Sequence, residues 1–411
     1  MAYQRRTLET ALKRAFRTFP AVLLSGPRQS GKTTLLKRLC GRTHHYVSLE
    51  DPDVRTQALS DPRGFLQRHP APVILDEIQY APDLLHYVKS AIDDDRRPAR
   101  WLITGSQGLS VMHGVSQSLA GRVAVLSLLP FSVNEARGRG NAEGRLSLTK
   151  LLDALMTGRD PVGPTSRPGL GDWILRGGYP EPRTRSRVDL RAWCAGYVRT
   201  YLERDVRAIV NVGNLSAFER FLRLCASRTA QILNLSDLAR QVGVSVPTAG
   251  QWLSVLEASQ ELFLLRPYFK SFGKRLVKAP KLYFMDTALA AYLIGLTREE
   301  TALAEPFGGA LMETAVVSAW HKAFLHRGEI PAMYYWRSSD GIEVDLLIDH
   351  DGKLHPIEIK RTSTLMPGHA AGLRKWMALS GNGGRDGLIF ADIAEATHVD
   401  RGIRGVPWSW I

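Results

Sequence analysis

The feature that most constrains the fold is a glycine-rich segment near the amino end, Gly26-Pro-Arg-Gln-Ser-Gly-Lys-Thr33. It fits the pattern G-x-x-x-x-G-K-[ST] and lies between an apolar run that ends at Leu24 and a helical stretch, 33–40. In such a strand–loop–helix unit, backbone N–H groups point inward and hold phosphate oxygens at a helix start that favours negative charge. The segment therefore predicts a parallel α/β domain that binds a nucleotide.

The residues of this loop have separate predicted roles. Lys32 is expected to reach the outer phosphates and to be needed for catalysis, and Thr33 is expected to supply a magnesium ligand. The residues predicted to bind the nucleotide are Gly26, Pro27, Arg28, Gln29, Ser30, Gly31, Lys32, Thr33 and Thr34. The alternative is a plain glycine-rich turn, but the strand and helix patterns on either side favour phosphate binding.

A second motif, Pro72-Val-Ile-Leu-Asp-Glu77, ends an apolar run with two carboxylates. We expect Asp76 to bind magnesium through a water molecule and Glu77 to act as the general base for the attacking water. A lone Asp-Glu pair at a strand end is more often a helix cap, so this prediction depends on the loop upstream.

Two further positions are candidate sensors of the nucleotide. The apolar run 101–103 leads to Ser106 and Gln107, whose polar side chains could sense the terminal phosphate or could simply be turn residues. Arg122 comes just before the next run and is a candidate for stabilising transition-state charge, in cis or in trans. An exposed arginine beside a strand is the simpler interpretation.

Residues 235–256 have the pattern of a helix-turn-helix. Ser236 and Ser245 are expected to cap its two helices, with Gly243 in the turn and Pro247 at the start of the second helix. Two strands are then predicted around the basic loop 266–280, which would be the wing of a winged helix.

The candidate DNA-binding residues of this module are Thr248, Gln251, Lys270, Lys274 and Arg275. The second helix has no arginine or lysine between 246 and 257, and these are the residues that normally read guanine. The basic loop is suited to phosphate contacts, which are independent of base sequence and depend on salt. The alternative is a module that only packs domains together.

Near the carboxyl end, segments 342–348 and 355–360 alternate polar and apolar residues around a strong turn, 349–353, which predicts a hairpin. A period of two puts Glu358 and Lys360 on one face of their strand. If Asp345 faces the same way, two carboxylates and an ammonium converge. Carboxylates are suitable magnesium ligands, and a lysine can orient or deprotonate a metal-activated water.

The order of Asp345, Glu358 and Lys360 resembles the PD-(D/E)xK nuclease core, with Val344 where the motif has proline. Glu313, on an otherwise apolar helix upstream, corresponds to the glutamate that a helix commonly supplies to this core. The resemblance implies a second site for Mg²⁺ or Mn²⁺, with Glu313, Asp345 and Glu358 as ligands and Lys360 as a catalytic residue. The alternative is a hairpin with a solvated charged face.

Motifs along nearly the whole chain resemble those of prokaryotic AAA-type ATP-binding proteins that carry a C-terminal domain of unknown function. The matching segments are 26–33, 75–77, 103–107, 118–122, 129–135, 177–181, 201–206, 283–286 and 357–360. The resemblance implies a sheet in which the sensor strand lies between the loop strand and the Asp-Glu strand. It also implies ATP with Mg²⁺, although the loop residues alone do not exclude GTP.

We therefore expect an α/β protein with four parts. These are a P-loop AAA-type ATPase domain with a parallel sheet (1–135), a flexible connection with a helical lid-like region (136–230), a winged helix-turn-helix (231–285) and a nuclease-like α/β domain (286–411).

Composition indicates where in the cell the protein is expected and which partners it is expected to bind. The chain has 54 Lys and Arg against 40 Asp and Glu, a net charge of +14, which favours nucleic acid as a partner. No apolar run approaches the roughly 20 residues of a membrane helix. The amino end lacks a secretory signal pattern, and the 3 cysteines have neither disulfide-framework nor zinc-site spacing. A cytoplasmic protein without membrane contact is expected.

Two classes of function are consistent with these features. The first is an ATP hydrolase coupled to a DNA-binding winged helix and a nuclease-like domain, with metal-dependent DNA endonuclease activity left open. The second is a nucleotide-dependent regulatory switch that binds DNA or protein and has a catalytically inert C-terminal domain. The pattern does not decide the oligomeric state.

Overall fold

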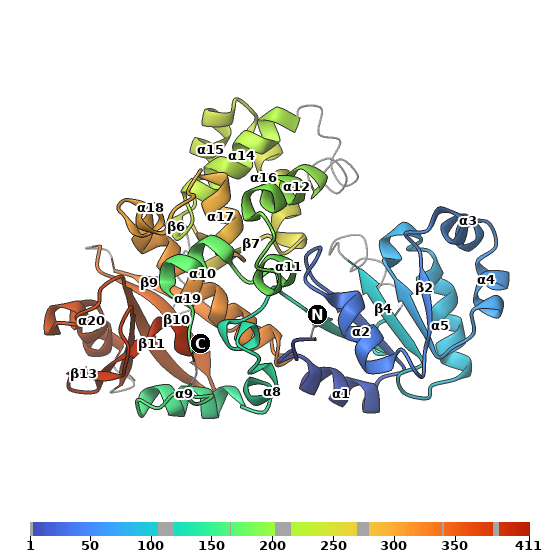
Figure 1. Cartoon of the computed structure of the whole chain (residues 1–411), viewed down its shortest axis with the longest axis horizontal. Coiled ribbons are helices and arrows are strands. Elements are labelled where there is room, and N and C mark those ends of the chain that lie inside the picture. Colours follow the sequence, from blue (N-terminus) through green and yellow to red (C-terminus); the bar gives the residue numbers. More distant parts are fainter. Residues whose placement is uncertain are drawn as a thin grey trace.

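The computed structural model describes residues 3–105, 119–164, 166–201, 215–268, 279–338, 341–380 and 386–411. The described chain forms two α/β units that lie beside each other, each built around its own sheet (Figure 1). The smaller unit is amino-terminal. The larger unit has a core that begins at Leu129 and extends to Ile411.

The amino-terminal unit contains a five-stranded sheet in the order β2-β3-β4-β1-β5, with all neighbouring strands parallel. Its strands are β1 (Ala21–Ser25), β2 (His45–Ser48), β3 (Val73–Asp76), β4 (Trp101–Gly105) and β5 (Val123–Ser127). The strand β4 lies between β1 and β3, which confirms the predicted place of the sensor strand.

Helices cover both faces of this sheet, which is why its strands are apolar on both sides. The helices are α1 (Glu9–Thr18), α2 (Lys32–Cys40), α3 (Pro52–Ser60), α4 (Pro62–Arg68) and α5 (Leu84–Asp94), with the 3-10 turn η1 (Ile78–Tyr80). Apolar residues of α1 and α2 pack with Val22 and Leu24, and those of α4 and α5 pack with Ala21 and Leu23. Successive residues of β1 thus face opposite helical layers.

The larger unit contains a nine-stranded mixed sheet in the order β13-β14-β12-β11-β10-β9-β7-β8-β6. Its strands are β6 (Gln231–Ile232), β7 (Leu262–Pro267), β8 (Lys281–Phe284), β9 (Met333–Arg337), β10 (Glu343–His350), β11 (Lys353–Lys360), β12 (Gly387–Ala391), β13 (Thr397–Asp400) and β14 (Ile403–Pro407). The parallel pairing of Arg266 with Tyr334 joins β7 to β9. The sheet therefore continues across the domain boundary expected at 285/286.

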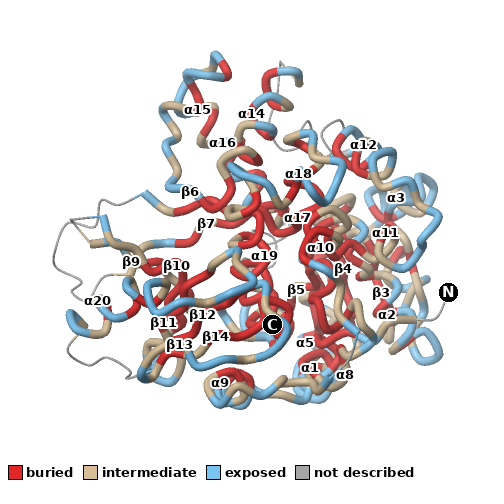
Figure 2. The backbone as a smooth tube through the Cα atoms, turned by 60° about the vertical axis from the view of Figure 1, so that its left-hand side comes forward, coloured by how far each residue is buried: buried red, intermediate tan, exposed pale blue. Residues whose placement is uncertain are grey.

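Helices surround this second sheet and connect it to the first. They are α7 (Val133–Ala136), α8 (Gly140–Glu143), α9 (Leu148–Met156), α10 (Leu170–Arg176), α11 (Pro180–Thr184), α12 (Leu190–Tyr201), α14 (Leu215–Ser227), α15 (Leu235–Val242), α16 (Val246–Ala258), α17 (Thr287–Leu293), α18 (Glu299–Leu303), α19 (Phe307–Leu325) and α20 (Ala371–Ser380), with the 3-10 turns η3 (Pro367–Ala370) and η4 (Trp408–Trp410). The long helix α19 is buried on nearly all sides (Figure 2). The regions expected as 136–230, 231–285 and 286–411 share one core around it.

The two helices of the expected helix-turn-helix are α15 and α16. Gly243 ends α15 with a φ of 83°, and the Ser245 side chain caps α16 by accepting a bond from Thr248 N at 3.2 Å. The cap of α15 is Asn234, which accepts from Asp237 N at 3.0 Å, and not Ser236 as expected. The helix begins two residues earlier than the expected cap indicated.

Two negative expectations can be checked on the described residues. No helix among them has the length and apolar content that crossing a bilayer would require. Cys40, Cys194 and Cys225 are buried free thiols.

Candidate functional site

The phosphate-binding loop joins β1 to α2, and both of its motif glycines are required by the backbone. Gly26 has a φ of 147°, and a Cβ atom there would lie 2.1 Å from the carbonyl oxygen of Leu128. Gly31 precedes α2 with a φ of 97°, in the region that favours glycine. The sequence therefore builds a tight turn whose following helix starts at Lys32.

The side chain of Lys32 is buried and folds over this turn. Its Nζ atom donates to the carbonyl oxygens of Gly26 and Pro27, both at 2.9 Å. Next to it, the Thr33 hydroxyl lies 3.0 Å from each carboxylate oxygen of Asp76 at the end of β3. The two residues predicted to bind magnesium therefore lie next to each other.

Asp76 receives its hydrogen bonds from hydroxyl groups. Besides Thr33, the Tyr46 hydroxyl donates to Oδ2 at 2.7 Å, and Thr104 on β4 donates to Oδ1. Burial and the bond to Asp76 raise the pKa of Tyr46, so this phenol stays protonated and keeps donating. Tyr46 was not predicted as a site residue, because it lies on a separate strand with no motif around it.

Glu77 follows Asp76 and occupies an unusual backbone conformation. Its φ of 60° and ψ of 53° place a non-glycine residue in the left-handed region, which occurs preferentially at functional sites. Its N–H donates to the Thr104 hydroxyl at 3.0 Å, and its carboxylate accepts from Gln79. These contacts fix the direction of the Glu77 side chain.

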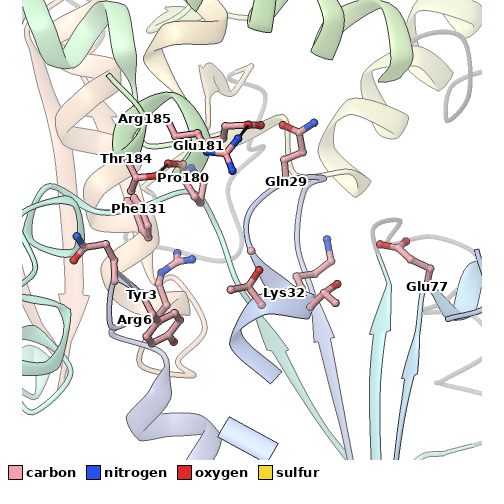
Figure 3. A pocket seen from close by; sticks show the side chains of 14 residues that line it. Tyr3, Arg6, Gln29, Lys32, Glu77, Phe131, Pro180, Glu181, Thr184 and Arg185 are labelled. Atoms are coloured by element: carbon pink, nitrogen blue, oxygen red, sulfur yellow. Dashed lines mark hydrogen bonds and ion pairs between the residues drawn. The ribbon is translucent and has the colours of Figure 1, made fainter. Parts of the chain in front are cut away.

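A cavity of about 510 Å³ lies over the loop, within the size range of small-molecule sites (Figure 3). Its lining residues are Tyr3, Gln4, Arg6, Gln29, Gly31, Lys32, Thr33, Thr34, Glu77, Phe131, Pro180, Glu181, Thr184 and Arg185. Figure 3 shows Lys32 and Glu77 on one side and the α11 residues on the other. The amino-terminal and α11 residues were not predicted, because folding alone brings them to the loop.

Arg6 connects this cavity to the second unit. Its guanidinium donates to the carbonyl oxygen of Ser30 at 2.8 Å and to that of Leu129 at 2.5 Å, and it lies 3.1 Å from Oε2 of Glu135. Burial opposes ionisation of Glu135, but Arg6 and His326 lower its pKa to about 2. Glu135 is thus a buried carboxylate held by a buried arginine.

His326 extends the same network to the end of α19. Its Nε2 atom accepts from Leu129 N at 3.2 Å, and its Nδ1 atom lies 3.4 Å from Oε1 of Glu135. Burial lowers the pKa of His326 to about 4, so the imidazole is neutral near pH 7 and can accept this bond. A chain of contacts therefore runs from the loop through Arg6 and Glu135 to α19.

The predicted sensors have different outcomes. Arg122 precedes β5, so it lies at the edge of the sheet where the parallel strands begin, whereas the loop follows the end of β1. Its Nε atom donates to Asp93 at 2.8 Å. Arg122 therefore lies at the wrong end of the sheet to stabilise transition-state charge at the loop of its own chain, which corrects the expected cis role. The trans role stays a prediction. Ser106 and Gln107 lie outside the described residues.

The residues present fit Mg²⁺ and a nucleoside triphosphate. Magnesium prefers oxygen ligands, and Thr33 and Asp76 bring a hydroxyl and a carboxylate together at the mouth of the loop. The cavity next to them extends from Thr33 to Tyr3 and Pro180, so it offers contacts for a base and a ribose as well as for phosphates.

The second predicted cluster lies on the sheet of the larger unit. β10 and β11 form the expected hairpin, with Leu346 paired to Ile357, so Asp345 and Glu358 fall opposite each other. Oδ2 of Asp345 accepts from Ile359 N at 2.8 Å, and Lys360 Nζ donates to Oε1 of Glu358 at 2.5 Å. The two strand carboxylates and the lysine share one face.

Glu313 reaches this cluster from α19, together with two residues that were not predicted. Lys281, at the start of β8, places its Nζ atom 2.8 Å from Oε1 of Glu313 and 4.0 Å from Oδ1 of Asp345. It also forms an ion pair with Glu343. No motif marks Lys281, which is far from the hairpin in sequence and enters the cluster through the continuous sheet.

Burial is the main influence on the acids of this cluster. It raises the pKa of Glu313 to about 7 and that of Glu358 to about 8, and it also raises the pKa of Asp345. Oε2 of Glu358 is buried and has no hydrogen-bond partner. Within the described ranges, however, no three acidic, histidine or cysteine side chains are arranged so that they could hold a metal ion.

The expected DNA-binding residues are only partly described. Gln251 is exposed on α16, and Thr248 is half-buried one turn before it. Lys270, Lys274 and Arg275 lie outside the described residues.

Three families match successive parts of the chain. Residues 18–137 match the AAA domain, residues 167–300 match a domain of unknown function (DUF8612), and residues 308–411 match another domain of unknown function (DUF4143). The first match covers the five-stranded sheet and its loop. The amino-terminal unit is thus an AAA-type P-loop ATPase-like domain with a parallel sheet.

Two of the matching solved structures resemble the chain only loosely. The Walker-type ATPase PABY2304 of Pyrococcus abyssi is 14% identical, with 71% of this chain and 96% of that one covered and a TM-score of 0.41. The Thermotoga maritima RuvB Holliday junction branch migration motor is 19% identical, with 63% and 88% covered and a TM-score of 0.27. Likenesses of this size support no conclusion about this chain.

Two curated relatives are much more similar. The uncharacterized proteins Rv2008c of Mycobacterium tuberculosis and Mb2031c of Mycobacterium bovis are each 32% identical over 366 residues, which span 89% of this chain and 75% of theirs. The alignment includes most of both units. The chain therefore belongs to the family of Rv2008c and Mb2031c, and within it combines an AAA domain with a carboxyl-terminal domain of unknown function.

Proposed function

We propose that this protein is a magnesium-dependent ATP hydrolase. The observation that carries the proposal is the cavity over the loop, where Lys32, Thr33 and Glu77 face one space of about 510 Å³. Adenine is the family expectation for the base, and hydrolysis is supported by the carboxylate of Glu77 at the edge of that space.

The residues would divide the work as follows. The amide groups of the loop hold the phosphates, Lys32 exchanges its carbonyl partners for outer phosphate oxygens, and Thr33 and Asp76 hold the metal. Bound Mg²⁺ would neutralise charge on the phosphates. Glu77 then orients the attacking water and accepts its proton, a contribution of about 10²–10⁴-fold.

The test is the rate of ATP hydrolysis by the full chain. We expect Glu77→Gln to lower turnover by about 10²–10⁴-fold while nucleotide still binds, because the general base is lost. Lys32→Ala should abolish turnover through lost phosphate binding. The matched control is Glu219→Gln, the same change on the exposed face of α14. Unchanged turnover in both loop-site variants would refute the proposal.

The arrangement also supports coupling between the nucleotide and the larger unit. Helix α11 contributes Pro180 and Glu181 to the cavity wall, and Arg6 bonds the loop carbonyl of Ser30 while pairing with Glu135. A phosphate that displaces the loop or α11 would thus alter contacts that reach α19. Such coupling would support the nucleotide-dependent switch expected from the sequence.

We further propose DNA as a partner of the larger unit. The order α14, β6, α15, α16, β7 and β8, with β8 between β6 and β7, is consistent with a winged helix, and the net charge of +14 is consistent with a polyanion. DNA affinity measured against salt tests this. Changing Lys270, Lys274 and Arg275 together to Gln should reduce the salt slope by about 3, because each phosphate contact contributes about 1. An unchanged slope would leave protein partners as the alternative.

For the carboxyl-terminal domain we propose a nuclease-like arrangement without cleavage, the inert alternative. The four predicted residues meet, which supports the resemblance to a nuclease core: Glu313, Asp345, Glu358 and Lys360. However, the ammonium of Lys281 lies among the carboxylates. The chain incubated with Mg²⁺ or Mn²⁺ and several forms of DNA should produce no cut. Cleavage that Asp345→Ala abolishes would establish the opposite.

A further inference from the structure

The carboxylate cluster of the larger unit already contains a cation. Lys281 is only 4% exposed, and its Nζ atom lies 2.8 Å from Oε1 of Glu313, forms an ion pair with Glu343 and is 4.0 Å from Oδ1 of Asp345. These three carboxylates come from α19 and β10, while the ammonium comes from β8. The ammonium of Lys281 therefore lies where α19, β10 and β8 meet.

Neighbouring residues donate further hydrogen bonds to the carboxylates that surround the ammonium. Oε1 of Glu313 also accepts from the Tyr283 hydroxyl at 2.5 Å, and Tyr283 is two residues after Lys281 on the same face of β8. Oδ2 of Asp345 is used by Ile359 N. The ammonium donates to Oε1 of Glu313 and pairs with Glu343, and Asp345 is its third acidic neighbour, so one fixed positive charge offsets part of the negative charge of the cluster without a metal.

A divalent ion does not fit beside this ammonium. Magnesium needs oxygen ligands at about 2.0–2.1 Å in an octahedral set, and Oε1 of Glu313 is already used by the ammonium and by the Tyr283 hydroxyl. Two cations next to each other in a buried site would also repel strongly. This agrees with the finding that, over the described residues, no three candidate ligands are placed to hold a metal.

We propose that Lys281 is the resident cation of this cluster and takes the place that a divalent metal would occupy. The chain then binds no Mg²⁺ or Mn²⁺ between Glu313 and Asp345, and the carboxylates serve to hold β8, α19 and β10 together. Removing the ammonium would free the oxygens of Glu313, Glu343 and Asp345, which are not arranged around a metal while Lys281 lies among them, to close around a divalent ion. The inference is independent of ATP binding at the loop.

The test counts Mn²⁺ bound by the full chain, stripped of metal and nucleotide, from the electron paramagnetic resonance of free Mn²⁺. Lys281→Met keeps the length of the side chain and removes its charge, and it should bind one more Mn²⁺ per chain than the unaltered protein. Lys281→Arg keeps the charge and should bind no more than the unaltered protein. Lys281→Met combined with Asp345→Asn should lose the added ion, which assigns it to this cluster.

Two results would overturn the proposal. One is a folded Lys281→Met chain that binds no more Mn²⁺ than the unaltered protein. The other is unaltered protein that binds a Mn²⁺ lost in Asp345→Asn, since the ammonium is intact in both. The second comparison does not require Lys281→Met to fold, and equal binding by the unaltered protein and Asp345→Asn supports the proposal.

Discussion

The loop site and the carboxyl-terminal cluster are made of the same residue types, with lysine and carboxylates brought to one point, but the lysines do different things. In the loop site, Lys32 bonds carbonyl oxygens, and Asp76 receives hydroxyl donors. In the cluster, Lys281 lies directly among Glu313, Glu343 and Asp345. The hydroxyl donors of Asp76 leave its negative charge available to a metal, whereas the ammonium of Lys281 already offsets part of the charge of its acidic neighbours.

The largest expected difference between the two sites is in stability. Lys281→Met leaves buried carboxylates without a counter-charge and should lower the free energy of unfolding by about 3–5 kcal/mol. The same change at Lys32 removes bonds to two neutral carbonyl oxygens and should cost about 1–2 kcal/mol. Urea unfolding of the nucleotide-free chain measures both. Equal losses would remove the distinction drawn between the lysines.

The next difference concerns pH. Burial raises the pKa of Glu358 to about 8 from an ordinary value of 4.5, so the folded state holds this proton more tightly than the unfolded state. The resulting stabilisation is complete below pH 4.5 and is lost as the pH rises toward about 8. At about 1.4 kcal/mol for each pKa unit, its loss is of the order of a few kcal/mol. Glu358→Gln removes the titrating group.

The measurement is therefore the difference in unfolding free energy between the unaltered chain and Glu358→Gln at several pH values. That difference should shift in favour of the variant as the pH increases between about 4.5 and 8. Because both chains keep His326 and the other titrating groups that do not interact with Glu358, the contributions of those groups cancel. A difference that does not vary with pH would show that Glu358 is not held as a neutral acid.

The smallest of these effects is the dependence of nucleotide affinity on magnesium. Asp76→Asn loses the charge and turns one accepting oxygen into a donating amide group, so the gain in ATP affinity on adding Mg²⁺ should fall by about tenfold, or about 1.4 kcal/mol. Asp83→Asn, an exposed change in the same unit, is the matched control. If Asp345→Asn removed the Mg²⁺ dependence and Asp76→Asn did not, the roles of the two sites would be reversed.

Features that depend on a few neighbouring residues were mostly predicted from the sequence. The loop glycines, the Asp-Glu strand end and the alternating hairpin with Asp345 and Glu358 are each set by a few neighbouring residues, and the structure has them where expected. The order of β1, β4 and β3 came from the family resemblance and is also present.

Residues that act through long-range packing were missed. Arg6 meets Ser30 and Glu135, and Lys281 meets Asp345, only because separate elements pack together, so no spacing in the sequence marks them. The error for Arg122 was of another kind: it precedes its strand, and the starts of parallel strands lie at the edge of the sheet opposite the loop that follows β1. The pairing of β7 with β9 likewise merges regions that composition had divided.

The central claim is that a purine triphosphate binds at the loop 26–33. Isothermal titration calorimetry of the full chain with ATP and Mg²⁺ measures it directly, with Lys32→Ala as the variant and circular dichroism to verify that both are folded. We predict one nucleotide per chain and a loss of at least about tenfold in affinity in the variant. Absence of binding by the unaltered chain for both ATP and GTP, or equal affinity in Lys32→Ala, would contradict the account.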